Sequence, residues 1–103
     1  MDQQVSISNI IRAQFGRQVE FLQHLIRAKS ANPYTPETSP PDVPVEEEVA
    51  AVIHQELHHL GFPSELHGVS PQRPNVVSYL PGMDKRAKTL IVTTHMDTVE
   101  PSG

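Results

Sequence analysis

The sequence predicts an α/β fold in which two N-terminal helices pack on the first strands of a mixed sheet. Up to Leu60, apolar residues recur three or four positions apart, which is the period of a helix that buries one side. After Gly61 this period gives way to short runs rich in β-branched residues, which favour strands. The chain has 103 residues and no visible internal repeat, which is enough for one small core.

We expect the first helix to run from about residue 6 to residue 29. Ser6 or Ser8 is suited to cap its start, and Arg27 and Lys29 lie favourably near its negative end. Gly16 weakens the middle by about 1 kcal/mol relative to alanine and need not break the helix. The predicted apolar stripe consists of Ile7, Ile11, Phe15, Val19, Leu22 and Ile26.

Residues 30–44 should form a proline-rich loop within the domain, because proline removes backbone donors and fixes φ. A second helix should follow over residues 44–60. Pro44 suits the first turn, and the run Glu46-Glu47-Glu48 complements the positive helix end. Gly61 should then end the helix in a left-handed conformation. The buried stripe of this helix would be Val49, Val52, Ile53, Leu57 and Leu60.

Short strands should complete the chain. Residues 64–69 predict a weak strand and residues 75–80 a better one, followed by a turn over residues 81–84. Residues 89–94 read Thr-Leu-Ile-Val-Thr-Thr, which is typical of a central strand buried on both faces. We therefore expect this strand at the centre of the sheet, with His95 at its carboxyl end.

Composition excludes several classes of partner. The net charge is −4 and the eight basic residues are scattered, so we predict no nucleic-acid partner. No apolar run approaches the ~20 residues that span a bilayer, so we predict no membrane partner. The chain lacks cysteine, which excludes disulfides and thiolate metal sites and fits a reducing compartment. With no signal pattern at its N-terminus, we expect a cytoplasmic protein.

The tripeptide His95-Met96-Asp97 is the best candidate for chemistry. Ligands and metals gather at the carboxyl ends of strands in open α/β sheets, and a neutral imidazole is a good zinc ligand. A carboxylate two residues later is able to hydrogen-bond the other ring nitrogen and orient the ring. Taken alone, however, the tripeptide arises often by chance. A strand-end histidine followed by an Asp that starts a turn explains it more simply.

Four landmarks cover almost the whole chain. They are the first helix Phe21-Leu22-Gln23-His24-Leu25-Ile26-Arg27 with its exit Ser30-Ala31-Asn32-Pro33, the second helix from Glu48-Val49-Ala50 to its stop Leu60-Gly61-Phe62, the strand Arg73-Pro74-Asn75-Val76-Val77 with Leu80-Pro81-Gly82, and the motif from Leu90 to Val99 with Pro101 and Gly103. In this order they resemble a family of di-zinc hydrolases that contains acetylornithine deacetylase, succinyl-diaminopimelate desuccinylase, aminoacylase and glutamate carboxypeptidase, in which the last landmark is the first metal motif.

The resemblance implies that His95 binds one of two zinc ions, for which cobalt is a possible substitute. It also implies that Asp97 is the active-site carboxylate that holds the His95 ring. The parent protein would then be a zinc-dependent amidohydrolase or metallopeptidase, such as a deacetylase, that hydrolyses the amide bond of N-acyl amino acids or small peptides. Members of the family also insert a second, lid domain that often dimerises, so the parent would be a candidate homodimer.

The family's general base and its other metal ligands come later in its sequences and have no counterpart in residues 1–103. We therefore expect residues 1–103 to be the N-terminal part of the catalytic domain, inactive in isolation, without the remainder of that domain or the lid domain. Thr94 stands where the family often has glycine, and Glu100 separates Val99 from Pro101. The proline loop is also longer than is common. These departures leave open which acyl group or amino acid is cleaved.

Two other hypotheses remain open. The chain could be a non-catalytic truncated remnant or an interaction module. It could also be a helical metal buffer that uses His54, His58 and His59, because His54 and His58 lie one helical turn apart. However, Glu56 is one position late for the His-Glu-x-x-His motif of metalloproteases, so a solvated helix face is the simpler explanation.

Overall fold

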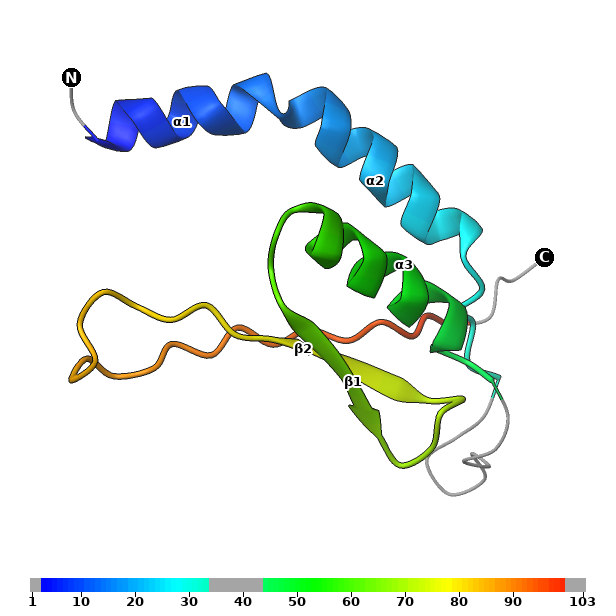
Figure 1. The fold of residues 1–103 in the computed structure, drawn as a ribbon. Helices are drawn as coiled ribbons and strands as arrows, with labels where there is room; N and C mark the ends of the chain where they lie inside the picture. The colour runs from blue at the N-terminus through cyan, green and yellow to red at the C-terminus, as the bar shows by residue number, and fades with distance from the viewer. Residues whose placement is uncertain (1–2, 34–43, 100–103) are drawn as a thin grey trace.

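The computed structural model describes residues 3–33 and 44–99, and Figure 1 shows how these residues are arranged. The described part contains helices α1 (Gln3–Ala13), α2 (Phe15–Arg27) and α3 (Glu47–His59). These are followed by strands β1 (Ser64–Gly68) and β2 (Pro74–Ser78), which form a two-stranded antiparallel sheet. The predicted combination of helices and sheet is confirmed in this general form. Most of the proline-rich loop, together with Glu100, Pro101 and Gly103, lies outside the described residues.

The single helix predicted over residues 6–29 is divided at Gln14. Gln14 has φ −96° and ψ 3°, and its N–H is shared between the carbonyls of Ile10 and Ile11 at 3.1 and 3.2 Å. The bend therefore lies at Gln14 rather than Gly16, and α1 and α2 form a bent rod (Figure 1). The helix begins at Gln3, upstream of both serines proposed as its cap. Its apolar stripe is exposed, from 37% at Val19 to 73% at Ile26.

Helix α3 ends as the sequence predicts. Gly61 has φ 85°, a left-handed conformation that glycine adopts without steric cost. The N–H of Phe62 bonds to the carbonyl of Leu57 at 2.8 Å, and that of Gly61 to the carbonyl of His58 at 3.0 Å. This pair of bonds is a Schellman motif, which satisfies the last carbonyls of the helix. The start is later than predicted, because Glu46 precedes the first helical residue.

Strands β1 and β2 form a hairpin that agrees with both predicted strands to within two residues at each end. Ser64 pairs with Ser78, and Gly68 pairs with Pro74. A Cβ on Gly68 would lie 2.5 Å from the Arg73 carbonyl oxygen, so this close approach of the two backbones requires glycine. The Arg73 N–H bonds to the Ser70 carbonyl at 3.1 Å and closes the turn between the strands.

The prediction of a central strand over residues 89–94 is wrong for this structure. The segment is in no strand, and Leu90, Ile91 and Val92 are 86%, 79% and 87% exposed. A strand requires a neighbour to accept and donate its ladder hydrogen bonds, and no described segment pairs with residues 89–94. His95 is therefore not at the end of a strand. The preceding turn also lies later than predicted, where the Ala87 N–H bonds to the Asp84 carbonyl at 3.1 Å.

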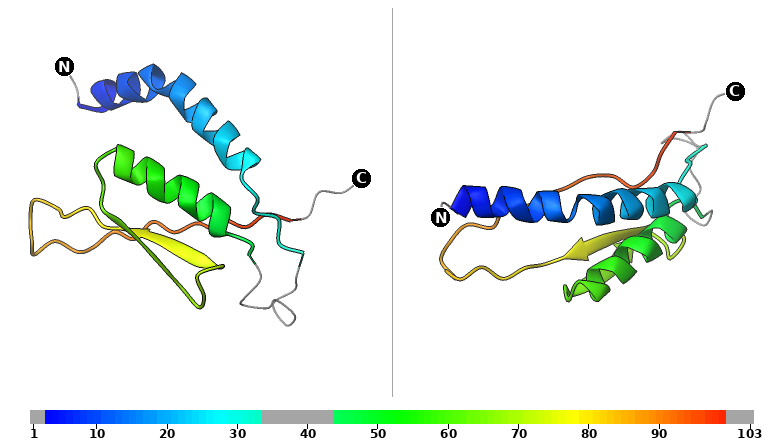
Figure 2. Two further views of the ribbon diagram at one scale, coloured as in Figure 1. Left: turned by 45° about the vertical axis from the view of Figure 1, so that its right-hand side comes forward. Right: turned by 90° about the horizontal axis from the view of Figure 1, so that it is seen from above.

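The buried residues gather where the start of α3 meets the end of α2 and the start of β2. Figure 2 shows α3 lying between α2 and the hairpin, while α1 continues from α2 beyond them and contacts no other described helix or strand. The predicted stripe of α3 is only partly buried, because Val49 is 4% exposed whereas Leu60 is 47% exposed. None of the described helices is long and apolar enough to cross a membrane. Among the residues whose burial is described, the buried apolar side chains are Ala28, Val45, Val49, Ala50 and Pro74.

Candidate functional site

The chain that leaves α2 holds the His95 motif in place. The Asn32 N–H bonds to the Thr98 carbonyl, and the Thr98 N–H bonds to the Ser30 carbonyl, both at 2.8 Å. These bonds make a parallel bridge between Ala31 and Thr98. The hydroxyls of Ser30 and Thr98 add a contact of 3.3 Å. Two landmarks that are far apart in the sequence, the helix exit and the metal motif, therefore lie side by side.

The imidazole of His95 is oriented by Asp97. Its Nδ1 lies 2.8 Å from the Asp97 backbone oxygen and 3.1 Å from the Asp97 Oδ1. A backbone oxygen and an ionised carboxylate only accept hydrogen bonds, so Nδ1 must carry the proton. The Nε2 lone pair is then available, and no described residue hydrogen-bonds it. The His95 side chain is 83% exposed, so a metal ion has access to this nitrogen.

The carboxylate of Asp97 is held from both sides. Asn32 Nδ2 donates to Asp97 Oδ2 at 3.1 Å, while Oδ1 faces His95. The pKa of Asp97 is lowered by the Asn32 hydrogen bond and then, against partial burial, by the hydrogen bond from His95 and by the charge that His95 carries when protonated. Asp97 is therefore ionised at neutral pH and is able to strengthen the imidazole as a metal ligand.

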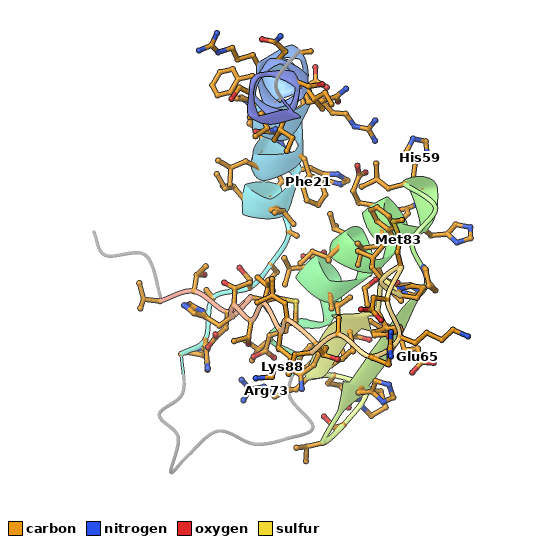
Figure 3. The ribbon with its side chains drawn as sticks, turned by 90° about the vertical axis from the view of Figure 1, so that its left-hand side faces the viewer. Phe21, His59, Glu65, Arg73, Met83 and Lys88 are labelled. Atoms are coloured by element: carbon orange, nitrogen blue, oxygen red, sulfur yellow. The ribbon has the colours of Figure 1, made fainter. Side chains whose placement is uncertain are left out.

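An ion pair that the sequence analysis did not assign to the site lies next to these residues. Arg73 donates to both carboxylate oxygens of Glu46, from Nε at 3.0 Å and from Nη2 at 2.7 Å. The pKa of Arg73 is raised by this hydrogen bond and, against desolvation, by the charges of Glu46 and Asp97. Figure 3 shows Arg73 on the side of the molecule away from α1. Glu46 therefore binds Arg73 in addition to lying at the positive end of α3. The sequence signal for a role of Arg73 was its place in the landmark Arg73-Pro74-Asn75.

His95 is the candidate metal ligand of the site. No group of three or more histidine, aspartate or glutamate side chains converges within residues 3–33 and 44–99. His54 is half-buried rather than solvated, and its Nδ1 lies 2.6 Å from the Ser64 hydroxyl of β1. His58 and His59 are exposed. The residues therefore fit one position of a zinc site at His95, and they do not form a helical three-histidine site.

Comparison of the chain with models of protein families, with curated proteins and with solved structures gave no match. The resemblance to the di-zinc hydrolases therefore stays a prediction, which depends on the sequence landmarks and the geometry around His95.

Proposed function

We propose that this chain forms the N-terminal part of the catalytic domain of a zinc-dependent amidohydrolase that cleaves N-acyl amino acids or small peptides. In this proposal His95 is one ligand of a two-metal centre, for which zinc or cobalt is suited, and Asp97 positions its ring. The remaining ligands, the general base and a lid domain that often dimerises belong to other parts of the enzyme. The cysteine-free sequence fits the reducing cytoplasm, which we propose as its compartment.

The observation that carries the proposal is the arrangement of His95 and Asp97. Two acceptors at one ring nitrogen keep the proton on Nδ1, so that Nε2 keeps its lone pair on a side chain that is 83% exposed. The exposed His67 contacts one carboxylate oxygen, Glu65 Oε2, at 2.7 Å from its Nε2, whereas the Nδ1 of His95 has two acceptors of Asp97 as support. Zinc-binding histidines usually have it, because a carboxylate or carbonyl on the second nitrogen fixes both tautomer and ring orientation.

The residues of this chain would contribute binding and orientation to the reaction. His95 would hold the metal, and the negative charge of Asp97 would increase the electron donation of the imidazole. When bound, zinc polarises a substrate carbonyl and lowers the pKa of a water molecule to about 7. Because catalytic zinc sites use about three protein ligands, we expect no metal-dependent amidase activity from residues 1–103 alone.

The exposed apolar surface supports a second candidate, an interaction module without catalytic activity. The stripe of α1 and α2 and the segment 89–94 are both exposed, although their compositions are typical of buried elements. In the hydrolase proposal these surfaces are covered by the rest of the catalytic domain. In the alternative they would be covered by another protein.

The coding sequence after Gly103 distinguishes the two candidates. A reading frame that continues through a strand followed by Asp, and then a Glu-Glu pair, supports the hydrolase, whereas a stop codon supports the remnant or module. In the protein encoded by the continued frame, His95→Ala should remove one metal per site and nearly all hydrolysis of a panel of N-acetyl amino acids. Asp97→Asn should lower metal affinity or activity by about 10–100-fold.

His58→Ala is the matched control, because His58 is an exposed histidine of α3 with no role in the proposed site. It should leave metal content and turnover unchanged. If His58→Ala were as damaging as His95→Ala, the assignment of the metal to His95 would be wrong. Metal-dependent turnover by residues 1–103 alone would also contradict the proposal.

A further inference from the structure

Asn32 contacts the carboxylate of Asp97 from a segment 65 residues away in the sequence. We infer that Asn32 is a positioning residue, whose amide holds Asp97 so that Asp97 keeps His95 in the tautomer that binds metal through Nε2. This inference rests on the proposed function, because the fixed ring matters only if His95 is a metal ligand. The sequence landmarks place Asn32 at the exit of α2 and assign it no such role.

Packing alone does not fix the two side chains. The side chain of Asp97 is 35% exposed and that of His95 is 83% exposed. The last torsion of an aspartate side chain has a broad energy profile, so a carboxylate at the surface turns readily. Hydrogen bonds must therefore set its orientation. With Oδ2 bound to Asn32, the other oxygen, Oδ1, faces the His95 Nδ1.

Asparagine has the properties that this position requires. Asp97 is an acceptor, so the Asn32 amide must present its NH₂ group to the carboxylate. A neutral donor stabilises the carboxylate without cancelling its charge, which then remains to strengthen the imidazole as a ligand. A lysine at this position would form an ion pair with Asp97 and compete with His95 for it.

The backbone around Asn32 is held independently of its side chain. The bonds from the Asn32 N–H to Thr98 and from the Thr98 N–H to Ser30 use backbone atoms only. Replacing the Asn32 side chain should therefore remove the contact with Asp97 and leave the bridge in place. Asn32→Ala removes the amide. Asn32→Asp keeps the shape but replaces the donor with a second carboxylate.

The test is the tautomer of His95 in the ¹⁵N-labelled 103-residue chain, measured by long-range ¹H–¹⁵N correlation at pH about 8, where an ordinary imidazole is neutral. In the native chain the Nδ1–H form should dominate. Asn32→Ala should lower the ratio of the Nδ1–H to the Nε2–H form by more than about twofold. One hydrogen bond of ordinary strength, about three- to tenfold, is the upper bound, because the Asp97 backbone oxygen, 2.8 Å from Nδ1, still accepts the proton. Asn32→Asp should lower it further, because two carboxylates repel each other.

Ser64→Ala is the control, because the Ser64 hydroxyl contacts the Nδ1 of His54 at 2.6 Å. It should change the tautomer of His54 and leave that of His95 unchanged. Slow exchange of the Thr98 amide in each Asn32 variant would show that the bridge is intact. The inference is overturned if the ratio of the Nδ1–H to the Nε2–H form of His95 stays within about twofold of the native value in both Asn32 variants. Such a change is smaller than the loss of one ordinary hydrogen bond.

Metal content of the complete enzyme tests the proposed function separately. If metal binds at His95 and the tautomer ignores Asn32, the positioning role is wrong and the hydrolase proposal stands. If the tautomer responds to Asn32 and no metal binds at His95, the contact positions the ring and the zinc assignment is wrong.

Discussion

Residues 44–78 and residues 79–94 have similar apolar side chains and opposite environments. In the first region, Val49 is 4% exposed between α3 and its neighbours. In the second, Val92 is 87% exposed on a chain that extends beyond the hairpin and returns toward the exit of α2 (Figure 1). The difference is one of pairing, since the first region contains a helix and two strands that contact one another.

The hairpin shows that pairing outweighs intrinsic propensity. Strand β1 has the sequence Ser-Glu-Leu-His-Gly, which contains no β-branched residue, yet it forms five residue pairs with β2. Residues 89–94 have a composition much better suited to a strand and form none within the described part. A strand is stabilised by cross-strand contacts and ladder bonds, so a suitable segment without a neighbour remains extended chain.

The largest expected effect concerns self-association of the exposed segment. An unpaired apolar run with free backbone groups recruits other chains, so the 103-residue protein should form dimers or larger species as its concentration rises. Ile91→Lys should shift the population to monomer, because it places a charge inside the run. Sedimentation velocity over a range of concentrations measures this.

Met83→Lys is the control, because it adds the same charge to an exposed residue outside the run. It should leave the association unchanged. A native chain that sediments as a single sharp monomer at high concentration would mean that residues 89–94 are covered in solution, and would count against the fragment proposal.

A smaller effect is expected on the free energy of unfolding when either of two ion pairs that differ in burial is broken. The side chains of Arg73 and Glu46 are 19% and 14% exposed, whereas those of Arg17 and Glu56 are 47% and 26% exposed. Arg73→Leu should lower the free energy of unfolding by about 2–3 kcal/mol, because it leaves a largely buried Glu46 carboxylate unpaired. Arg17→Leu should cost less than about 1 kcal/mol. Urea unfolding of both variants provides the comparison, and equal losses would show that the Arg73 pair is solvated.

The smallest expected effect is the change in the free energy of unfolding when either of two valines is replaced by alanine. Val49→Ala should lower the free energy of unfolding by about 1–2 kcal/mol, because it removes buried methyl groups next to Ala50. Val92→Ala should change it by less than about 0.5 kcal/mol, since the side chain already contacts water. Urea unfolding measures both. If the two variants lost equal stability, the second region would be packed in solution and the contrast between the regions would disappear.

Local chemistry determined much of what the sequence predicted correctly. Gly61 ends α3 because its positive φ is cheap only for glycine, and a single residue carries that signal. The two strands of the hairpin were predicted from their local composition, whereas their antiparallel pairing was not predicted. The proximity of His95 to Asp97 was equally accessible, since two residues of spacing bring their side chains within reach. The break at Gln14 was missed, since glycine at Gly16 was the only local signal of weakness.

Tertiary structure decided everything that depends on distant partners. Composition alone indicated a buried strand over residues 89–94, and only the arrangement in space shows that no described segment pairs with it. The same holds for the contacts between Asn32 and Asp97 and between Arg73 and Glu46. Periodicity reports which side of an element is apolar, but it does not specify which residue on another element will face it. These long-range contacts follow from how the helices and the hairpin pack, because packing brings together side chains that are 65 and 27 residues apart in the sequence.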